Sequence, residues 1–363
     1  MPSVVEFPFE ILMFIFRNLH VEDIKNSRTT CRSFHDVASE YLIKHVYIWA
    51  HPESFDRLRK IANHPIFRRT VRDIHYSTDC YHLQLDSESA YLEIREYLYR
   101  CQSRSCPVLV GAELTQSFEA YHNAALSQSE LNWNGAEEGM AAAFSLMPSI
   151  STVVVRRSYS LKLPKRLHED TEIMITIRPP PSSEQEMLEE VPVQGCWGLF
   201  RALSQARARV SQLYIGAWNI SNWSVTRDIS VTPSWLLKDA CNFYQYLKVI
   251  ELNVQTADYL RNQADNRPQL LLWAAQSIED LSLNFAASDD SFVPLRDIIG
   301  DTTWPRLRSA KFCGVEASDE DLIEFYNRHS SCLNEIKVDG SLIYVTDLGK
   351  SFRLSLSAVL NDP

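Results

Sequence analysis

FPFEILMFIFRNLHVEDIKNSRTTCRSFHDVASEYL, residues 7–42, is the stretch that decides how the rest of the chain is interpreted. Pro8 suits the first position of a helix, where its missing N–H would have no partner anyway. The apolar residues that follow recur with helical spacing and form a wide stripe: Ile11, Leu12, Ile15, Phe16 and Leu19. Because Phe9, Met13 and Phe14 add apolar surface outside this stripe, we expect the first helix to be covered on most sides.

Two more helices are expected in the same stretch. Glu22 and Asp23 stand where a second helix would begin, because carboxylates are favourable near the positive end of a helix. A third apolar stripe with helical spacing contains Phe34, Val37, Ala38, Tyr41 and Leu42. Three helices of this size bury little core by themselves. We therefore expect another protein to cover part of them; the alternative is that they are the first helices of a larger core.

At these positions the sequence resembles the F-box, the motif through which substrate receptors dock on the Skp linker of Skp–cullin–F-box ubiquitin ligases. The residues that fit the motif are, in order, Pro8, Glu10, Ile11, Leu12, Ile15, Phe16, Leu19, Asp23, Ile24, Arg28, Cys31, Arg32, Phe34, Ala38 and Leu42. The departures are mild: Phe7 and Ile24 replace leucines, and Thr30 stands where an aliphatic residue is common. The resemblance is confined to residues 7–42.

The resemblance implies a receptor subunit rather than an enzyme. Such a protein docks on a Skp-type linker, and through it on a cullin, while its C-terminal domain binds a protein substrate of unknown identity. The implied partner-binding residues are Pro8, Ile11, Leu12, Ile15, Phe16, Leu19, Ile24, Cys31 and Phe34. Two alternatives stay open: a scaffold that binds the Skp linker outside the ligase, and an enzyme whose site has no readable motif.

The composition narrows the possible partners and compartments. Among the 363 residues, 45% are hydrophobic and 23% are charged, which is ordinary for a globular protein. A net charge of −10 argues against general binding to nucleic acid. Residues 7–16 are too short to span a membrane and are interrupted by Glu10, so we expect no membrane contact. The 8 cysteines are scattered, as in a reducing compartment, which predicts a cytoplasmic or nuclear location.

Motifs for catalysis and for bound groups are missing from the sequence. There is no G-x-G-x-x-G, no P-loop, no G-x-S-x-G and no H-E-x-x-H, and glycine is scarce, with 10 residues. No cysteine pair has the spacing of zinc ligands. The sequence therefore predicts no catalytic residue, no cofactor and no metal ion.

A weak repeat runs through the remainder of the chain. Seven segments carry apolar residues at positions one, four and six: Val71-Ile74-Tyr76, Ile150-Val153-Val155, Val210-Leu213-Ile215, Leu247-Ile250-Leu252, Ile278-Leu281-Leu283, Leu307-Ala310-Phe312 and Leu333-Ile336-Val338. This is the L-x-x-L-x-L core of a leucine-rich-repeat strand. The last five follow at intervals of 26 to 37 residues, which leaves room for a strand, a turn and a helix. In the final interval, Ser318 and Asp321 resemble a capping pair.

The repeat has a competing interpretation. Gln255 and Ala286 occupy places where a leucine-rich repeat would have asparagine, and the same spacing can arise by chance. A non-repetitive α/β or α+β domain is therefore the alternative. The layout nevertheless resembles the fungal type of F-box protein with a degenerate leucine-rich C-terminal region, in particular TWPRLRSAKF at 303–312 and SCLNEIKVDG at 331–340.

Together these patterns predict an α/β chain in which an N-terminal three-helix F-box precedes an irregular leucine-rich-repeat-like α/β solenoid. The expected parts are an F-box at residues 1–48, a helical linker at 49–70 and a substrate-recognition domain at 71–363. The linker is suggested by a basic helical segment whose mixed charge is typical of a solvated surface. The proline run 179–181 and the acidic residues after it predict an exposed loop or, alternatively, a partner-binding or phosphorylation-controlled segment.

Overall fold

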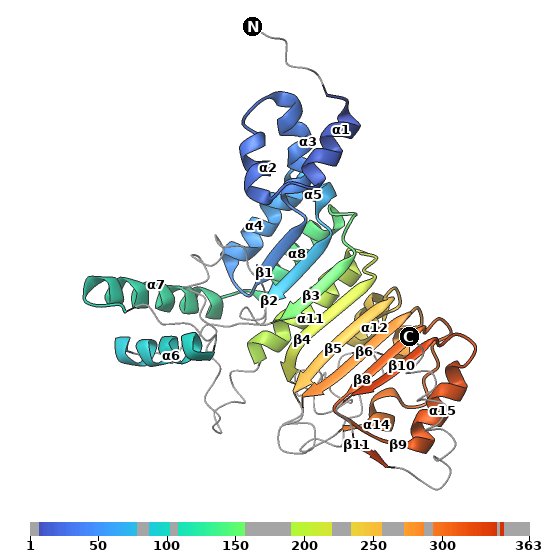
Figure 1. Cartoon of the computed structure of the whole chain (residues 1–363). Helices are drawn as coiled ribbons and strands as arrows, with labels where there is room; N and C mark the ends of the chain where they lie inside the picture. The colour runs from blue at the N-terminus through green and yellow to red at the C-terminus, as the bar shows by residue number, and fades with distance from the viewer. Residues whose placement is uncertain are drawn as a thin grey trace.

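Eight parallel strands form one sheet and lie side by side in the order in which they follow along the chain (Figure 1). The structure is a computed structural model, and it describes residues 7–77, 87–101, 108–156, 190–219, 234–255, 272–286, 293–339 and 342–344. The strands are β1 (His45–Trp49), β2 (Asp73–Ser77), β3 (Thr152–Arg156), β4 (Gln212–Asn219), β5 (Val249–Gln255), β6 (Asp280–Ala286), β8 (Ser309–Cys313) and β10 (Glu335–Asp339).

The predicted strand segments are parallel neighbours in register. Their central residues pair across the sheet, each with the next, in the series Val46, Ile74, Val153, Leu213, Ile250, Leu281, Ala310 and Ile336. All of these side chains are buried in one core, because alternate residues of a strand point to the same face. Val46 belongs to an eighth segment, Ile43-Val46-Ile48, which has the same spacing but falls in the part expected as F-box, residues 1–48, and was not predicted as a strand.

A repeated hydrogen-bond pattern fixes this register. The carbonyl oxygen of Lys44 accepts from the backbone N–H groups of Arg72, at 2.9 Å, and Asp73, at 3.1 Å. The same double acceptance recurs before each following strand, at the carbonyls of Arg72, Ser151, Ser211, Lys248, Glu279 and Arg308. A slip of one residue would turn every apolar side chain toward the opposite face, so these contacts and the buried core enforce the same alignment.

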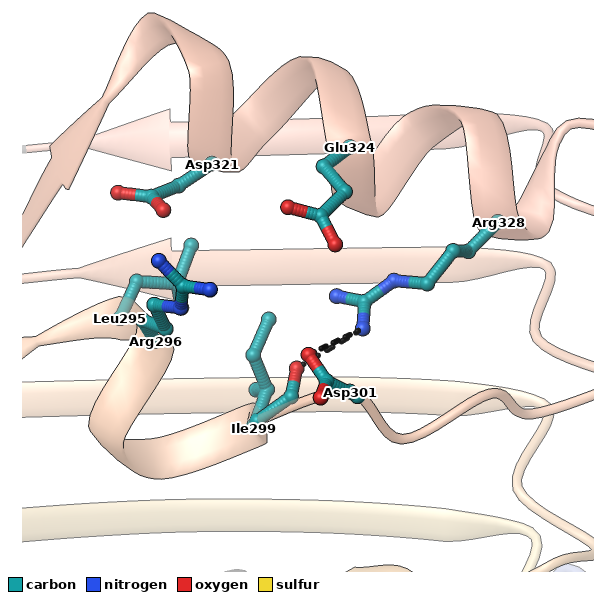
Figure 2. A pocket seen from close by; sticks show the side chains of 8 residues that line it. Leu295, Arg296, Ile299, Asp301, Asp321, Glu324 and Arg328 are labelled. Carbon is teal, nitrogen blue, oxygen red and sulfur yellow. Dashed lines mark hydrogen bonds and ion pairs between the residues drawn. The ribbon is translucent and has the colours of Figure 1, made fainter.

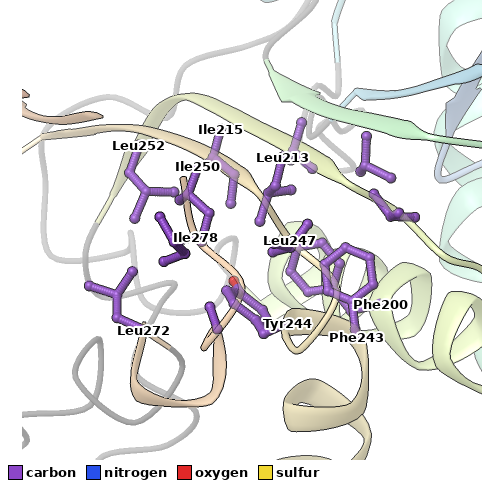
Figure 3. Close-up of a cluster of buried hydrophobic side chains, with 14 of the residues drawn as sticks. Phe200, Leu213, Ile215, Phe243, Tyr244, Leu247, Ile250, Leu252, Leu272 and Ile278 are labelled. Carbon is purple, nitrogen blue, oxygen red and sulfur yellow. The ribbon is translucent and has the colours of Figure 1, made fainter. Parts of the chain in front are cut away.

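Helices cover one face of the sheet, and no helix of the described ranges packs on the other, which we call the uncovered face (Figure 1). The covering helices are α4 (Pro52–Asn63), α8 (Trp133–Ser145), α11 (Glu190–Gln205) and α12 (Ser234–Tyr244). Between α11, α12 and the strands the core is aromatic, with the rings of Phe200 and Phe243 stacked at 4.9 Å (Figure 3). Leu213 and Ile250 from the strands complete this layer (Figure 3).

An N-terminal three-helix module lies at the β1 end of the sheet (Figure 1). It consists of α1 (Phe9–Arg17), α2 (Val21–Ser27) and α3 (Arg32–Leu42). The short helix α5 (Phe67–Thr70) joins it to the sheet: Thr70 donates its hydroxyl to the Ile43 carbonyl at 2.9 Å. The Arg28 guanidinium lies 5.8 Å from the centre of the Phe67 ring. The module is thus attached by direct packing.

The segment expected as a linker, residues 49–70, is helical but packs as part of the sheet domain. Trp49 ends β1, and Leu58 and Ala62 of α4 are each 1% exposed within the core of the sheet. Arg59 and Lys60 face solvent on the opposite side of α4. The charges of the segment lie on this outer side, whereas its apolar residues pack on the sheet. The segment therefore belongs to the same packed unit as the strands, and the expected boundary at residue 70 falls inside that unit.

The remaining elements flank the sheet. Helices α6 (Glu88–Cys101) and α7 (Ala112–Ser129) follow β2 along the chain and project away from the sheet (Figure 1). At the far end, α14 (Leu295–Ile299) and α15 (Asp319–His329) accompany a small sheet of β7 (Val293–Pro294), β9 (Val315–Ser318) and β11 (Leu342–Tyr344). The capping pair is confirmed, since Ser318 and Asp321 form a reciprocal capping box at the start of α15. The proline run 179–181 lies outside the described residues.

Candidate functional site

The three-helix module has a small core of its own. Leu12 and Phe16 stand one helical turn apart on α1 and are 3% and 1% exposed. They pack with Ile24 of α2 and with Val37 and Ala38 of α3. The ring of Phe34 meets that of Phe16 edge-on, with centroids 5.5 Å apart. One side of α1 is therefore fully covered within the chain.

The other side of α1 exposes large apolar side chains. Ile11 is 47% exposed, Phe14 70% and Ile15 39%. Ile11 and Ile15 are one helical turn apart, and Phe14 lies three residues after Ile11, so the three side chains neighbour one another on the helix surface. We call Ile11, Phe14 and Ile15 the α1 face. Phe9 is also 50% exposed, but it stands three residues before Leu12 and so begins the covered side of the helix. A contiguous apolar patch of this kind marks an interaction surface more often than isolated exposed residues do.

The α1 face lies on a short helix that has no side-chain cap at its start and is closed by a side-chain contact at its end. The Pro8 carbonyl accepts from the N–H groups of Ile11, at 3.0 Å, and Leu12, at 3.2 Å. The helix begins at Phe9, so Pro8 precedes the first helical residue instead of occupying it. At the other end, Asn18 donates its side-chain amide to the Phe14 carbonyl at 2.8 Å. Because the exposed side chains of the α1 face are apolar, a partner would cover them with apolar surface.

The nine residues predicted to bind a partner fall into three groups. Pro8, Ile11 and Ile15 are exposed, while Leu19, Cys31 and Phe34 are half-buried. Leu12, Phe16 and Ile24 are buried in the core of the module and support the α1 face from behind. That any of the nine touches a partner stays a prediction.

Phe9 and Phe14 were not among the predicted binding residues. The signal for them was present, because both are apolar residues outside the first helical stripe. Substitution of Leu12 or Phe16 would disturb the core of the module, so a test of docking has to use exposed residues.

A second candidate location is a hollow between α14 and α15 (Figure 2). There Arg328 donates from Nη1 to the Gly300 carbonyl at 3.0 Å, and the same nitrogen lies 3.6 Å from Asp301 Oδ1. The hollow has room for no more than about one water molecule. Its charged side chains thus tie α15 to the turn after α14, and the space is too small for a substrate.

Two buried titratable groups of the described core, Cys196 and His329, have the surroundings of packing residues. Burial raises the pKa of the Cys196 thiol well above its usual value, so the thiol stays protonated and unreactive. Burial lowers the pKa of His329, which is held in one tautomer: Nε2 accepts from the Trp304 N–H at 3.0 Å and Nδ1 lies 2.8 Å from the Phe325 carbonyl. These contacts are those of a packing residue.

Comparison with known families identifies the module. Residues 5–49 match the family model described as F-box-like. The chain carries an F-box-like domain. No curated protein matches the chain. The match ends at Trp49, the last residue of β1, so the F-box-like domain and the sheet share their first strand.

An F-box-like domain supports binding of a Skp-type protein and an adaptor role in a ligase of the Skp–cullin–F-box type. Within the described ranges, no helix combines the length and apolar character needed to cross a bilayer.

Proposed function

We propose that this protein is a non-catalytic substrate-recognition adaptor of a Skp–cullin–F-box ubiquitin ligase. The F-box-like domain binds the Skp linker through the α1 face, and the linker connects it to a cullin. The single observation that carries the proposal is the exposure of Ile11, Phe14 and Ile15 within the region that matches the F-box-like family. Burial of three such side chains in a partner would contribute about 1.5–3 kcal/mol each.

The sheet domain would select the target. We interpret it as an irregular leucine-rich-repeat-like solenoid of the fungal F-box type, which is supported by its in-register parallel strands and by helices on one face. Its uncovered face presents polar side chains, for example Asn284, which donates from Nδ2 to Asn253 Oδ1 at 2.9 Å. Such residues are suited to contacts with a protein target.

The direct attachment of the F-box-like domain to β1 gives the adaptor a defined geometry. The Lys44 carbonyl, at the end of the domain, accepts from two N–H groups at the start of β2. A target held on the sheet would keep a fixed orientation relative to the ligase, which raises its effective concentration near the ubiquitin-charged enzyme. We expect this to occur in the cytoplasm or nucleus.

Co-purification with a Skp-type linker tests the proposal. Replacement of Ile11 and Ile15 together by Asp puts two charges on the α1 face and should weaken binding at least about a hundredfold. The matched control is Val110→Asp, because Val110 is 67% exposed and lies outside the F-box-like domain. Circular dichroism should show that all three proteins are folded. Wild-type protein that does not bind, or a double variant that binds like the control, contradicts the proposal.

A half-life measurement separates the ligase adaptor from a Skp-binding scaffold. The Ile11→Asp, Ile15→Asp variant keeps the sheet domain but loses the link to degradation, so it should prolong the lifetime of a protein that it still binds. Mass spectrometry of partners trapped by this variant identifies candidates for that protein. If no trapped protein changes its lifetime although docking is lost, the scaffold is the better interpretation.

A further inference from the structure

Two histidines and an aspartate come together on the uncovered face of the first two strands. His45 of β1 is the register partner of Asp73 of β2, and Tyr47 is the partner of His75. Asp73 and His75 are two residues apart, so both side chains leave the same face of β2. The intervening residues Val46 and Ile74 point into the core. The strand pairing thus fixes three potential metal ligands at one place.

The three side chains are close enough to share one ion. Their candidate ligand atoms all lie within 4.8 Å of one another. The closest pair is His45 Nδ1 and Asp73 Oδ2, at 2.6 Å, and the rings of His45 and His75 have centroids 5.5 Å apart. Zinc bonds of about 2.0–2.1 Å place two ligands of one tetrahedral ion about 3.3 Å apart. The widest pair would therefore close by up to about 1.5 Å. His45 and Asp73 would separate slightly, and the proton between them would be released when the ion binds.

Neighbouring residues hold the trio in a form suited to a cation. The Asp73 carboxylate accepts side-chain hydrogen bonds from His45, at 2.6 Å, and from Thr152, its register partner on β3. The hydroxyl of Thr152 orients the carboxylate from β3, as outer partners of metal ligands do. The Tyr47 ring lies 4.9 Å from the His75 ring and limits its rotation.

The donor set indicates which kind of ion would fit. Imidazole nitrogens suit zinc and related transition metals, whereas calcium and magnesium prefer oxygen ligands. Two histidines with one carboxylate is a ligand set of zinc sites that keep an open position. The His45 side chain is 52% exposed, so water can reach the trio.

We propose that His45, Asp73 and His75 bind one divalent transition-metal ion of the zinc class, with water in the open position. The ion would join β1, the strand shared with the F-box-like domain, to β2. This site does not depend on the proposed ligase function, and no motif in the sequence suggests it. Its ligands come from separate strands and approach one another only through the parallel register.

Titration with Zn²⁺ in competition with a chromogenic chelator tests the proposal on the purified full chain. Wild type should bind one equivalent, and His45→Ala should weaken binding by about a hundredfold. The matched control is His35→Ala, because His35 is also exposed and paired with an aspartate, Asp36, at 3.2 Å, but it belongs to no cluster of three ligands within the described residues. This control should bind like wild type.

Two further variants keep the test decisive. Asp73→Asn preserves the shape of the side chain and should also lose binding, whereas Thr152→Val should reduce affinity by only about tenfold. Co²⁺ in place of Zn²⁺ should give visible absorption in wild type that is lost in His45→Ala. Circular dichroism without metal checks that each variant is folded. Wild type without a one-to-one site, or a His35→Ala loss equal to that of His45→Ala, would overturn the proposal and indicate only adventitious histidine binding.

Discussion

Helices α1 and α15 lie near opposite ends of the described chain and use their apolar residues differently. In α15, Leu322 and Phe325 are 3% and 0% exposed, and Glu320 and Glu324 occupy exposed positions. In α1, Leu12 and Phe16 are buried in the same way, but the opposite side carries Ile11 and Phe14 in place of charges. Helix α15 begins with a reciprocal capping box, whereas α1 has no side-chain cap.

The apolar surface of α15 is largely covered within the chain, whereas we expect another protein to cover the exposed apolar side of α1. Both helices bury one apolar side, so periodicity alone describes them equally well. What distinguishes them is the outer side, where α15 is polar enough to face water and α1 presents a contiguous apolar patch. Substitutions on the two helices should therefore affect different quantities: stability for α15 and binding for α1.

The largest effect is expected from Phe325→Ala. The Phe325 ring is fully buried and lies 5.4 Å from Phe312 and 4.5 Å from His329. Its removal leaves a cavity and should lower the free energy of unfolding by about 3–5 kcal/mol. Urea unfolding followed by circular dichroism measures this. Tyr326→Ala, at the next and exposed position, is the control and should change stability far less; equal losses would contradict the assigned packing.

A smaller effect is expected from Ser318→Ala at the start of α15. The Ser318 hydroxyl accepts from the Asp321 N–H at 3.0 Å, and Asp321 Oδ2 accepts from the Ser318 N–H at 3.0 Å. Loss of the cap should cost about 1 kcal/mol. Ser318→Asn retains a capping acceptor and should recover most of that stability in the same assay. If Ser318→Ala unfolds at the urea concentration of wild type, the cap contributes nothing.

The buried His329 predicts a pH dependence of stability. Burial lowers the pKa of His329, so below about pH 6.5 the unfolded chain binds a proton at this residue more readily than the folded chain does. The contribution of neutral His329 to the free energy of unfolding is therefore fully present above about pH 6.5 and is lost as the pH falls below that value. Urea unfolding between pH 8 and pH 5 should show a decrease in wild type that is shallower in His329→Gln. Identical pH profiles would show that another group is responsible.

The smallest effect on stability is expected from Phe14→Ala. Because this ring is 70% exposed, its loss should change the free energy of unfolding by no more than about 0.5 kcal/mol. The same substitution should weaken binding to a Skp-type linker, which isothermal titration calorimetry measures. A marked loss of stability would mean that Phe14 packs within the chain, and unchanged affinity would remove it from the α1 face.

The sequence predicted seven of the strands because each places the same three apolar positions against one core, fully buried in most segments and partly buried at Leu333 and Val338. Ile43-Val46-Ile48 was missed because those residues had been assigned to the end of the F-box. Periodicity also could not say which of the adjacent residues Ile11 and Leu12 faces the core of the module, since both are apolar. The trio of His45, Asp73 and His75 required the register between two strands, which depends on the whole sheet.

Hydrogen exchange of the complex with a Skp-type linker tests most directly whether another protein completes α1. Exchange of the backbone amides is compared for the free chain and the complex, with α1 as the expected contact and α15 as the internal reference. We predict that amides of Phe9–Arg17 exchange more slowly in the complex, while those of Asp319–His329 are unchanged. A complex in which α1 exchanges as in the free chain, with protection elsewhere, would contradict the assignment of the docking face.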